Sequence, residues 1–210
     1  GFSILLNAQS SALRKANKYY SQQAFARAIP YYEKAYRSDS SDKFVLASLG
    51  DCYRLTNNTA GQLKCYGGLV KNGKAEPIHK LYYGQALMEY GQKNQAKTYL
   101  EAYTIDSRGK ELASSIEKAK QYTKNADAYK VDLCSFNSPQ SDFCAVVFNN
   151  TIVFSSTRAN TKWINEKHGW TNESYLNLYS AEKNGGKDTP PKVFMGDLTS
   201  KYNDGPVSFA

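Results

Sequence analysis

The apolar residues change their spacing once along the chain. From about residue 10 to residue 122 they recur three and four positions apart, which is typical of amphipathic helices. From about residue 144 apolar and polar residues alternate, which is typical of half-buried strands. The pattern predicts an α+β chain of several parts: a short apolar segment at 1–9, a helical domain at 10–125 and a strand-bearing region at 126–210.

The helical part contains an internal repeat with a period of 34 residues. A small residue and, three positions later, a large one recur at this step, and so does a large residue in the second half of each unit. These positions are Ala16, Gly50 and Gly84, then Tyr19, Tyr53 and Leu87, then Tyr32, Tyr66 and Leu100. Ala28 and Ala96 also correspond, whereas Gln62 occupies the middle position and departs from the pattern.

Each unit is predicted to be a pair of antiparallel helices. The small residue lets the two helices approach closely, and the large residue fills the neighbouring gap on the same face. Thr56–Asn58 and Tyr90–Asn94 supply turn residues between helices, because Asn and Gly tolerate left-handed backbone angles. Pro30 is expected within about the first turn of its helix, where a missing N–H is tolerated. Residues 110–122 predict a final amphipathic helix whose apolar face holds Leu112, Ile116 and Ala119.

The three units resemble the tetratricopeptide repeat over about residues 9–110. That resemblance implies an α-solenoid with a concave groove lined by the first helix of each pair, which would bind a peptide or a protein. The groove positions would be Asn17, Tyr20, Phe44, Asp51, Arg54, Ile78, Gln85 and Met88. The alternative is that these residues face solvent or another part of the same chain.

The second part predicts four strands in sequence. Cys144–Phe148 and Thr151–Ser156 flank an Asn-Asn pair and predict a hairpin. A polar loop with Trp163, His168 and Trp170 follows, then a strand in 174–183 and another in 192–198. Residues 207–210 would begin a fifth.

These strands resemble the first blade of a WD40-like (PD40) β-propeller. The stretches that carry the resemblance are Ile152–Arg158, Leu176–Ala181 and Asp204–Ala210. It implies an incomplete propeller, since closure needs about four to eight blades. It also implies that Ser155, Ser156 and Arg158 have structural roles, satisfying buried backbone groups where a strand ends.

The order of parts resembles a family of Bacteroidetes envelope proteins. In that family a secretion signal, tetratricopeptide repeats and a PD40 propeller usually precede an OmpA-type peptidoglycan-binding domain. Some members accompany PorP/SprF-like outer-membrane barrels in type IX secretion and gliding motility. The resemblance implies a periplasmic, outer-membrane-associated scaffold with a protein partner, and peptidoglycan contact through a domain that these residues do not contain.

The net charge of +8 raises the question of nucleic-acid binding. The lysines are scattered among acidic residues and tyrosines, and no dense basic tract or zinc-finger spacing occurs. The composition therefore favours a solvated basic surface and no nucleic-acid partner. No apolar run reaches the length of a membrane span, so none is expected.

The N-terminal segment indicates export. Phe2, Ile4, Leu5 and Leu6 form a short apolar run, and Leu6-x-Ala8 loosely fits a signal-peptidase site. We favour the tail of a secretory signal over its alternative, the first turn of a core helix. If the second holds, the protein would be a cytoplasmic repeat adaptor.

The four cysteines have no zinc-finger spacing. Cys52 and Cys65 are expected on facing helices as buried free thiols. Cys134 and Cys144 flank a turn-like stretch; a bridge between them stays open, although free thiols are favoured.

No catalytic, cofactor-binding or metal-ligating motif is found in the sequence, which predicts a non-enzyme. His79 is expected on a helix surface and His168 in a polar loop, and no G-x-S-x-G or H-E-x-x-H motif occurs. Glu33 and Glu101 fit solvated helix faces. The alternative function is a propeller that gates a hydrolase encoded further along the chain.

Overall fold

The computed structural model describes residues 2–159, 167–184, 187–200 and 202–209. They form two compact units. The first consists of Gly1–Tyr129 together with Gly169–Thr171, and the second of Lys130–His168 and Asn172–Ala210. The predicted loop residue Trp163 lies outside the described residues.

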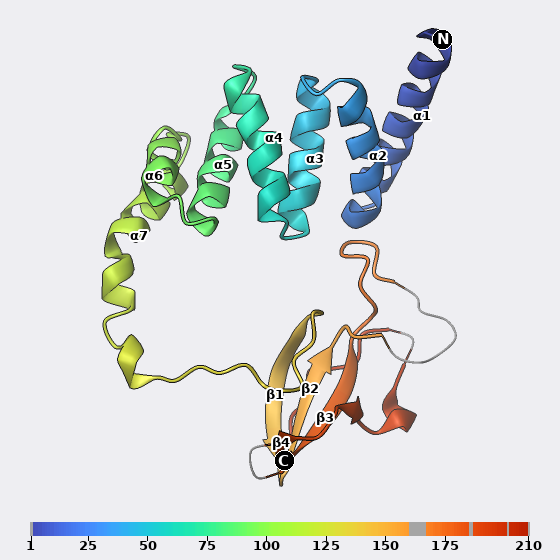
Figure 1. The fold of residues 1–210 in the computed structure, drawn as a ribbon, viewed down its shortest axis with the longest axis vertical. Coiled ribbons are helices and arrows are strands. Elements are labelled where there is room, and N and C mark those ends of the chain that lie inside the picture. The colour runs from blue at the N-terminus through green and yellow to red at the C-terminus, as the bar shows by residue number, and fades with distance from the viewer. Residues whose placement is uncertain (1, 160–166, 185–186, 201, 210) are drawn as a thin grey trace. The chain divides into compact units, whose positions relative to one another are not determined.

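The first unit is a row of seven α-helices (Figure 1). Each helix packs against the next, so the helices form consecutive antiparallel pairs closed by a last helix, which is the arrangement of a helical repeat solenoid. The helices are α1 (Phe2–Ser21), α2 (Phe25–Ser38), α3 (Lys43–Leu55), α4 (Thr59–Lys71), α5 (Pro77–Glu89), α6 (Lys93–Glu101) and α7 (Arg108–Tyr122).

The helix boundaries follow from local capping. The Asp42 carboxylate accepts hydrogen bonds from the backbone N–H groups of Phe44 and Val45 at the start of α3. The Asn58 side chain accepts from the Gly61 N–H at the start of α4. Asn57 and Gly91 take positive φ angles between helices, which confirms the turn chemistry predicted there.

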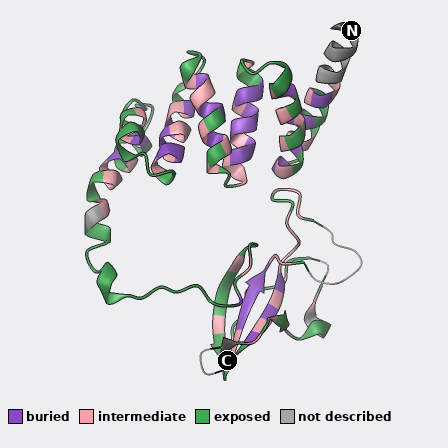
Figure 2. Ribbon diagram, viewed as in Figure 1, coloured by how far each residue is buried: buried purple, intermediate pink, exposed green. Residues whose placement is uncertain are grey.

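The period of 34 residues describes the core correctly. Tyr32, Tyr66 and Leu100 are fully buried on the second helix of each pair. A Cβ atom on Gly50 would lie 2.8 Å from the Tyr66 ring, and one on Gly84 would lie 2.8 Å from Leu100. Glycine is therefore needed at these two positions, because the large residue of the partner helix occupies the space that a side chain would fill. Figure 2 shows the buried residues distributed along these helices.

Two helical predictions need correction. Pro30 is the sixth residue of α2, beyond the first turn, because α2 begins already at Phe25. The final helix begins at Arg108, two residues earlier than predicted, and it buries the Ala113 side chain, with Leu112 and Ile116 partly buried beside it. α1 begins at Phe2, so residues 2–9, which the sequence assigns to a leader, are helical and continuous with the first repeat helix, and their role in export stays a prediction.

The second unit is a small antiparallel sheet in the order β1-β2-β3-β4, with β5 also paired to β3. Its strands are β1 (Asp142–Phe148), β2 (Thr151–Ser156), β3 (Asn177–Asn184), β4 (Lys187–Asp188) and β5 (Lys192–Val193). The predicted hairpin is confirmed: β1 pairs with β2 across Asn149-Asn150, and Asn149 has a φ of 53°. β1 carries a bulge between Phe143 and Val146, where Cys144 has a positive φ.

The last two predicted strands are wrong in extent. The strand expected over 192–198 ends at Val193, because Met195 takes a left-handed conformation and Gly196–Leu198 form a 3-10 turn. Residues 207–209 form no ladder. Instead the Phe209 ring stacks on Phe148 at 4.1 Å and meets Phe194 edge to face.

A polar network holds the end of the sheet. The Arg158 guanidinium donates to the Asp142 carboxylate at 2.8 Å and to the Phe136 carbonyl at 3.0 Å. The Ser156 hydroxyl accepts from the N–H and the Nε–H of Arg158. These contacts bear out the structural roles of Ser156 and Arg158. The role expected for Ser155 is wrong, because its buried hydroxyl has no hydrogen-bond partner among the described residues.

No helix in the described part of the chain combines the length and apolar character that a membrane crossing requires.

Candidate protein-binding surface

The eight residues predicted to line a groove lie on α1, α3 and α5, the first helix of each pair. We call the surface that they form the first-helix surface. The structure brings Tyr20, Asp51 and Arg54 together in one hydrogen-bonded cluster. It places Asn17 beside the cluster, and Phe44, Ile78, Gln85 and Met88 outside its hydrogen bonds.

Asp51 is the centre of this cluster. Its carboxylate accepts a hydrogen bond from the Tyr66 hydroxyl at 2.8 Å and from the Tyr20 hydroxyl at 3.3 Å. Burial and the neighbouring Asp51 charge raise the pKa of Tyr20 to about 12 and also raise the pKa of Tyr66. Both hydroxyls therefore stay protonated and keep Asp51 supplied with donors, linking α1, α3 and α4.

Arg54 extends the cluster to α5. Its guanidinium lies 3.5 Å from Asp51 and 4.2 Å from the centre of the Tyr82 ring, a cation–π arrangement. The side chain is 30% exposed, and its Nε–H is buried without a hydrogen-bond partner among the described residues. Arg54 thus presents part of a cation whose hydrogen bonds are incompletely used.

Asn17 repeats the same contact one unit earlier. The Tyr32 hydroxyl donates to the Asn17 side chain at 2.8 Å, as the Tyr66 hydroxyl does to Asp51. Both pairs are separated by 15 residues. In the third unit the equivalent residues are Leu100 and Gln85, and leucine has no hydroxyl to donate.

The remaining predicted residues differ in exposure. Phe44 is 53% exposed at the start of α3. Ile78 and Met88 pack against the core of α5, α6 and α7, so their side chains serve the fold as well as the surface. Gln85 is half-buried on α5.

Sequence reasoning missed Tyr66 and Tyr82 as members of the cluster. Tyr66 was assigned only to the core, and the signal that could have revealed its second role is a hydroxyl on a core aromatic, which needs a partner. The expected surface position of His79 is wrong. His79 is buried, accepts a hydrogen bond from the Glu76 N–H through Nδ1, and stacks on Tyr66.

The structure also places the cysteines and the two glutamates that the sequence analysis considered. Cys52 and Cys65 are buried free thiols, as predicted, and burial raises the pKa of each to about 12. Cys134 and Cys144 are exposed free thiols, without the bridge that the sequence left open. Glu101 is exposed as expected, whereas Glu33 is half-buried and accepts a 2.6 Å hydrogen bond from Tyr53.

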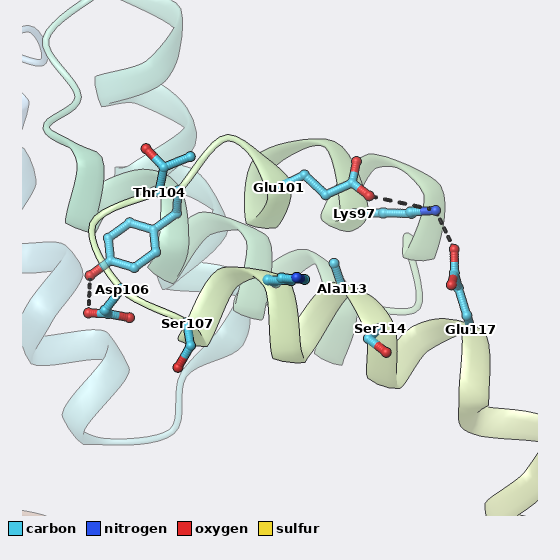
Figure 3. Close-up of a pocket in the computed structure, with 10 residues that line it drawn as sticks. Lys97, Glu101, Thr104, Asp106, Ser107, Ala113, Ser114 and Glu117 are labelled. Atoms are coloured by element: carbon cyan, nitrogen blue, oxygen red, sulfur yellow. Dashed lines mark hydrogen bonds and ion pairs between the residues drawn. The ribbon is translucent and has the colours of Figure 1, made fainter.

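A cavity of about 590 Å³ lies between α6 and α7 (Figure 3). Lys97 bridges Glu101 and Glu117 at its rim, and Tyr103 donates to Asp106 at 2.7 Å. These carboxylates are engaged in pairs with cations or hydroxyls, and the lining residues include no histidine or cysteine.

Within the part of the chain that the structure describes, no group of three or more His, Cys, Asp or Glu side chains could hold a metal ion. No protein-family model matches the chain, and no curated protein matches it. The chemistry of the first-helix surface is therefore the basis for a functional conclusion.

Proposed function

We propose that the protein is a protein–protein interaction scaffold whose first-helix surface binds the partner. The observation that supports this most strongly is the Tyr20–Asp51–Arg54–Tyr82 cluster, which crosses from α1 through α3 to α5. Three successive helical pairs thus contribute side chains to one continuous polar and aromatic surface.

The composition of this surface suits protein recognition. Tyrosine and arginine are enriched among the residues that contribute most to protein interfaces. Asp51 holds Tyr20 and Arg54 in place before a partner arrives, which lowers the entropy lost on binding. Phe44 adds an exposed aromatic ring on α3.

The finer assignment is part of the same proposal. The helical pairs would be tetratricopeptide repeats, and the antiparallel sheet would be one blade of a PD40 β-propeller. The protein would act in the periplasm of a Bacteroidetes envelope, binding a PorP/SprF-like barrel or another secretion or gliding component. Peptidoglycan contact would belong to an OmpA-type domain further along a longer polypeptide.

The surface is tested in the native protein by replacing Phe44 and Arg54 with alanine and Tyr20 with phenylalanine, which keeps the ring that packs against the core, and by purifying the envelope complex. We expect the outer-membrane barrel to be lost from the purified complex. Met88 is left unchanged, because it packs against the core and its loss would affect folding.

The matched control carries Arg37→Ala, Tyr90→Ala and Tyr122→Phe, at three exposed residues outside the first-helix surface. It removes the same kinds of side chain and should retain the barrel. Retention of the barrel by the first variant would contradict binding through this surface.

Export is tested separately by N-terminal sequencing of the native protein. We expect a mature start within or just after residues 1–9. An intact start upstream of Gly1 would contradict the periplasmic assignment and favour the cytoplasmic adaptor.

A further inference from the structure

Three residues from late in the sequence belong to the first unit. Gly169–Thr171 are grouped with the helices, although the residues on both sides of them belong to the second unit. The contacts that place them there are made by Trp170 and, less closely, by Gly169.

The Trp170 ring packs into the edge formed by the α1–α2 turn and the end of α3. Its ring meets the buried Phe25 edge to face at a centroid distance of 4.7 Å. The α1–α2 turn also supplies Ala24, whose Cβ would lie 3.6 Å from a Cβ atom added to Gly169. Trp170 is thereby packed against the main core of the helices.

Two hydrogen bonds complete the contact, and both use backbone groups that helix ends leave unpaired. The Trp170 indole N–H donates to the carbonyl of Leu55, the last residue of α3, at 2.6 Å. The Ala26 N–H, in the first turn of α2, donates to the Trp170 carbonyl at 3.1 Å. The N-cap residue Ala24 has no side chain to do this, so Trp170 supplies the missing cap from outside the helix.

The chain presents Trp170 on a closed turn. The His168 N–H donates to the Glu173 carbonyl and the Asn172 N–H donates to the His168 carbonyl, both at 2.8 Å. Lys167 and Ser174 form an isolated antiparallel bridge below them. A turn that is already closed loses less conformational entropy when it binds.

We propose that this edge of the helical unit is a second binding site, distinct from the first-helix surface, and that its ligand is a tryptophan-bearing turn. In this chain Gly169–Thr171 fill the site. The same site would accept a turn of this sequence supplied by a separate molecule when its own tryptophan is absent.

The site recognises three features of a ligand. Phe25 selects a flat aromatic ring, the Leu55 carbonyl selects a ring with an N–H donor, and the Ala26 N–H fixes the backbone beside it. A phenylalanine turn lacks the donor, so the site should discriminate against it.

The first test uses the full chain with Trp163→Phe, which leaves Trp170 as the single tryptophan, since the chain has two. We expect a blue-shifted emission and an acrylamide-quenching constant several-fold lower than that of free tryptophan amide. The single indole N–H should also exchange slowly with solvent by NMR, a measurement that needs no destabilising change. Quenching and exchange equal to the free amide would overturn the proposal.

The second test supplies the turn in trans. The Trp163→Phe, Trp170→Ala double variant contains no tryptophan, so an added synthetic peptide of residues 167–174 is the only indole reporter. Within one chain the turn has an effective concentration in the millimolar range, and it fills the site only if its dissociation constant lies below that concentration. Half-saturation is therefore expected at or below about 1 mM peptide.

The controls are two further peptides, one of the same composition in shuffled order and one with Trp170→Phe. Each is tested for its ability to displace the original peptide. We expect both to compete at least several-fold less well than the original peptide. An absence of saturable binding, or equal binding by the shuffled peptide, would overturn the proposal. Neither result depends on the partner of the first-helix surface, so failure here is distinguishable from failure there.

Discussion

The helical unit and the sheet unit exclude water from their interiors in different ways. The helices bury a long series of apolar side chains, including fully buried Tyr32, Leu46, Leu49, Tyr66 and Leu100. The sheet has a small core of Phe136, Phe154, Tyr179 and Ala181 and relies on the Arg158–Asp142 pair beside it. Stability is therefore distributed over many residues in one unit and concentrated at a few in the other.

This difference predicts where single changes matter. In a repeat array each unit contacts only its neighbours, so damage spreads little along the row. In the sheet, Arg158 contacts the rings of Phe154 and Tyr179, the Asp142 carboxylate and the Phe136 carbonyl at once. The Ser156 hydroxyl, which accepts from the Arg158 Nε–H, is a fifth contact that depends on this one side chain.

The largest effect is expected for Arg158→Ala. Arg158 and Asp142 are only 15% and 10% exposed, so the change leaves a buried carboxylate without its cation and should destabilise the sheet unit by about 3–5 kcal/mol. Hydrogen exchange of peptides covering β1 and β2 measures this for the sheet alone. Unchanged protection in residues 142–156 would show that the pair does not hold the sheet.

The Asp142 carboxyl reports on the same network. Burial alone would raise its pKa, but hydrogen bonds from Ser156, Arg158 and Ser138 outweigh this, and the pKa is lowered. A carboxyl pKa that is lower in the folded state contributes stability above its unfolded value and loses it as the pH falls. The acid sensitivity of the sheet should therefore decrease in Arg158→Ala.

A smaller effect is expected for Gly50→Ala in the helical unit. The new methyl group would meet the Tyr66 ring at 2.8 Å, and Tyr66 cannot easily move because its hydroxyl is held by Asp51. The expected destabilisation is about 1–3 kcal/mol, measured by urea denaturation followed by helix circular dichroism.

Gly68→Ala is the matched control, because it also lies inside a helix. Its nearest neighbour is the flexible end of Leu46 at 3.3 Å, so it should be neutral or stabilising by up to about 1 kcal/mol. Equal effects of the two substitutions would contradict the close approach at Gly50.

A pH dependence is expected from His79. Burial lowers its pKa below the unfolded value of 6.5, against the opposing influence of Glu76 and Asp51, while Lys43 acts in the same direction as burial. The unfolded chain therefore binds a proton first as the pH falls, so stability is constant above about pH 6.5 and decreases below it.

The His79→Gln variant should lose this decrease between pH 7 and pH 5. Urea midpoints of the two proteins across this range measure the difference. Glu76 does not interfere, because its pKa is lowered from 4.5 and it titrates below the window. Parallel curves for the two proteins would contradict the prediction.

The smallest effect is expected for Arg108→Ala. Arg108 pairs with Asp106 at 2.8 Å, but the two side chains are 52% and 40% exposed, and exposed ion pairs contribute little. The denaturation midpoint should not change measurably. A loss comparable to that of Arg158→Ala would show that burial is not what separates the two pairs.

The helical unit was largely predictable because its information is periodic. The step of 34 residues identified Gly50 and Tyr66 as recurring positions, and the structure places them against each other. The residues Asn17, Tyr20, Asp51 and Arg54 were found by the same reasoning. Their hydrogen bonds and ion pair were not predicted, since repeat position indicates the face of a helix and gives no information on which side chains reach one another.

The sheet was less predictable because its information is non-local. The hairpin at Asn149-Asn150 has a local turn signal, whereas the end of β5 depends on Met195 adopting a left-handed conformation. Trp170 was assigned to a polar loop, because nothing near it in sequence indicates that Leu55, 115 residues earlier, accepts its N–H.

The tyrosine contact that recurs in the first two helical pairs, and stops at Leu100 in the third, gives the repeat array unequal ends. Polar groups surround Asn17 and Asp51, whereas Ile78 and Met88 contribute apolar side chains at the opposite end of the same row. An extended ligand lying along the row would contact polar groups at one end and apolar groups at the other. The two ends of the row therefore differ in chemistry, so a ligand lying along it would have a preferred orientation.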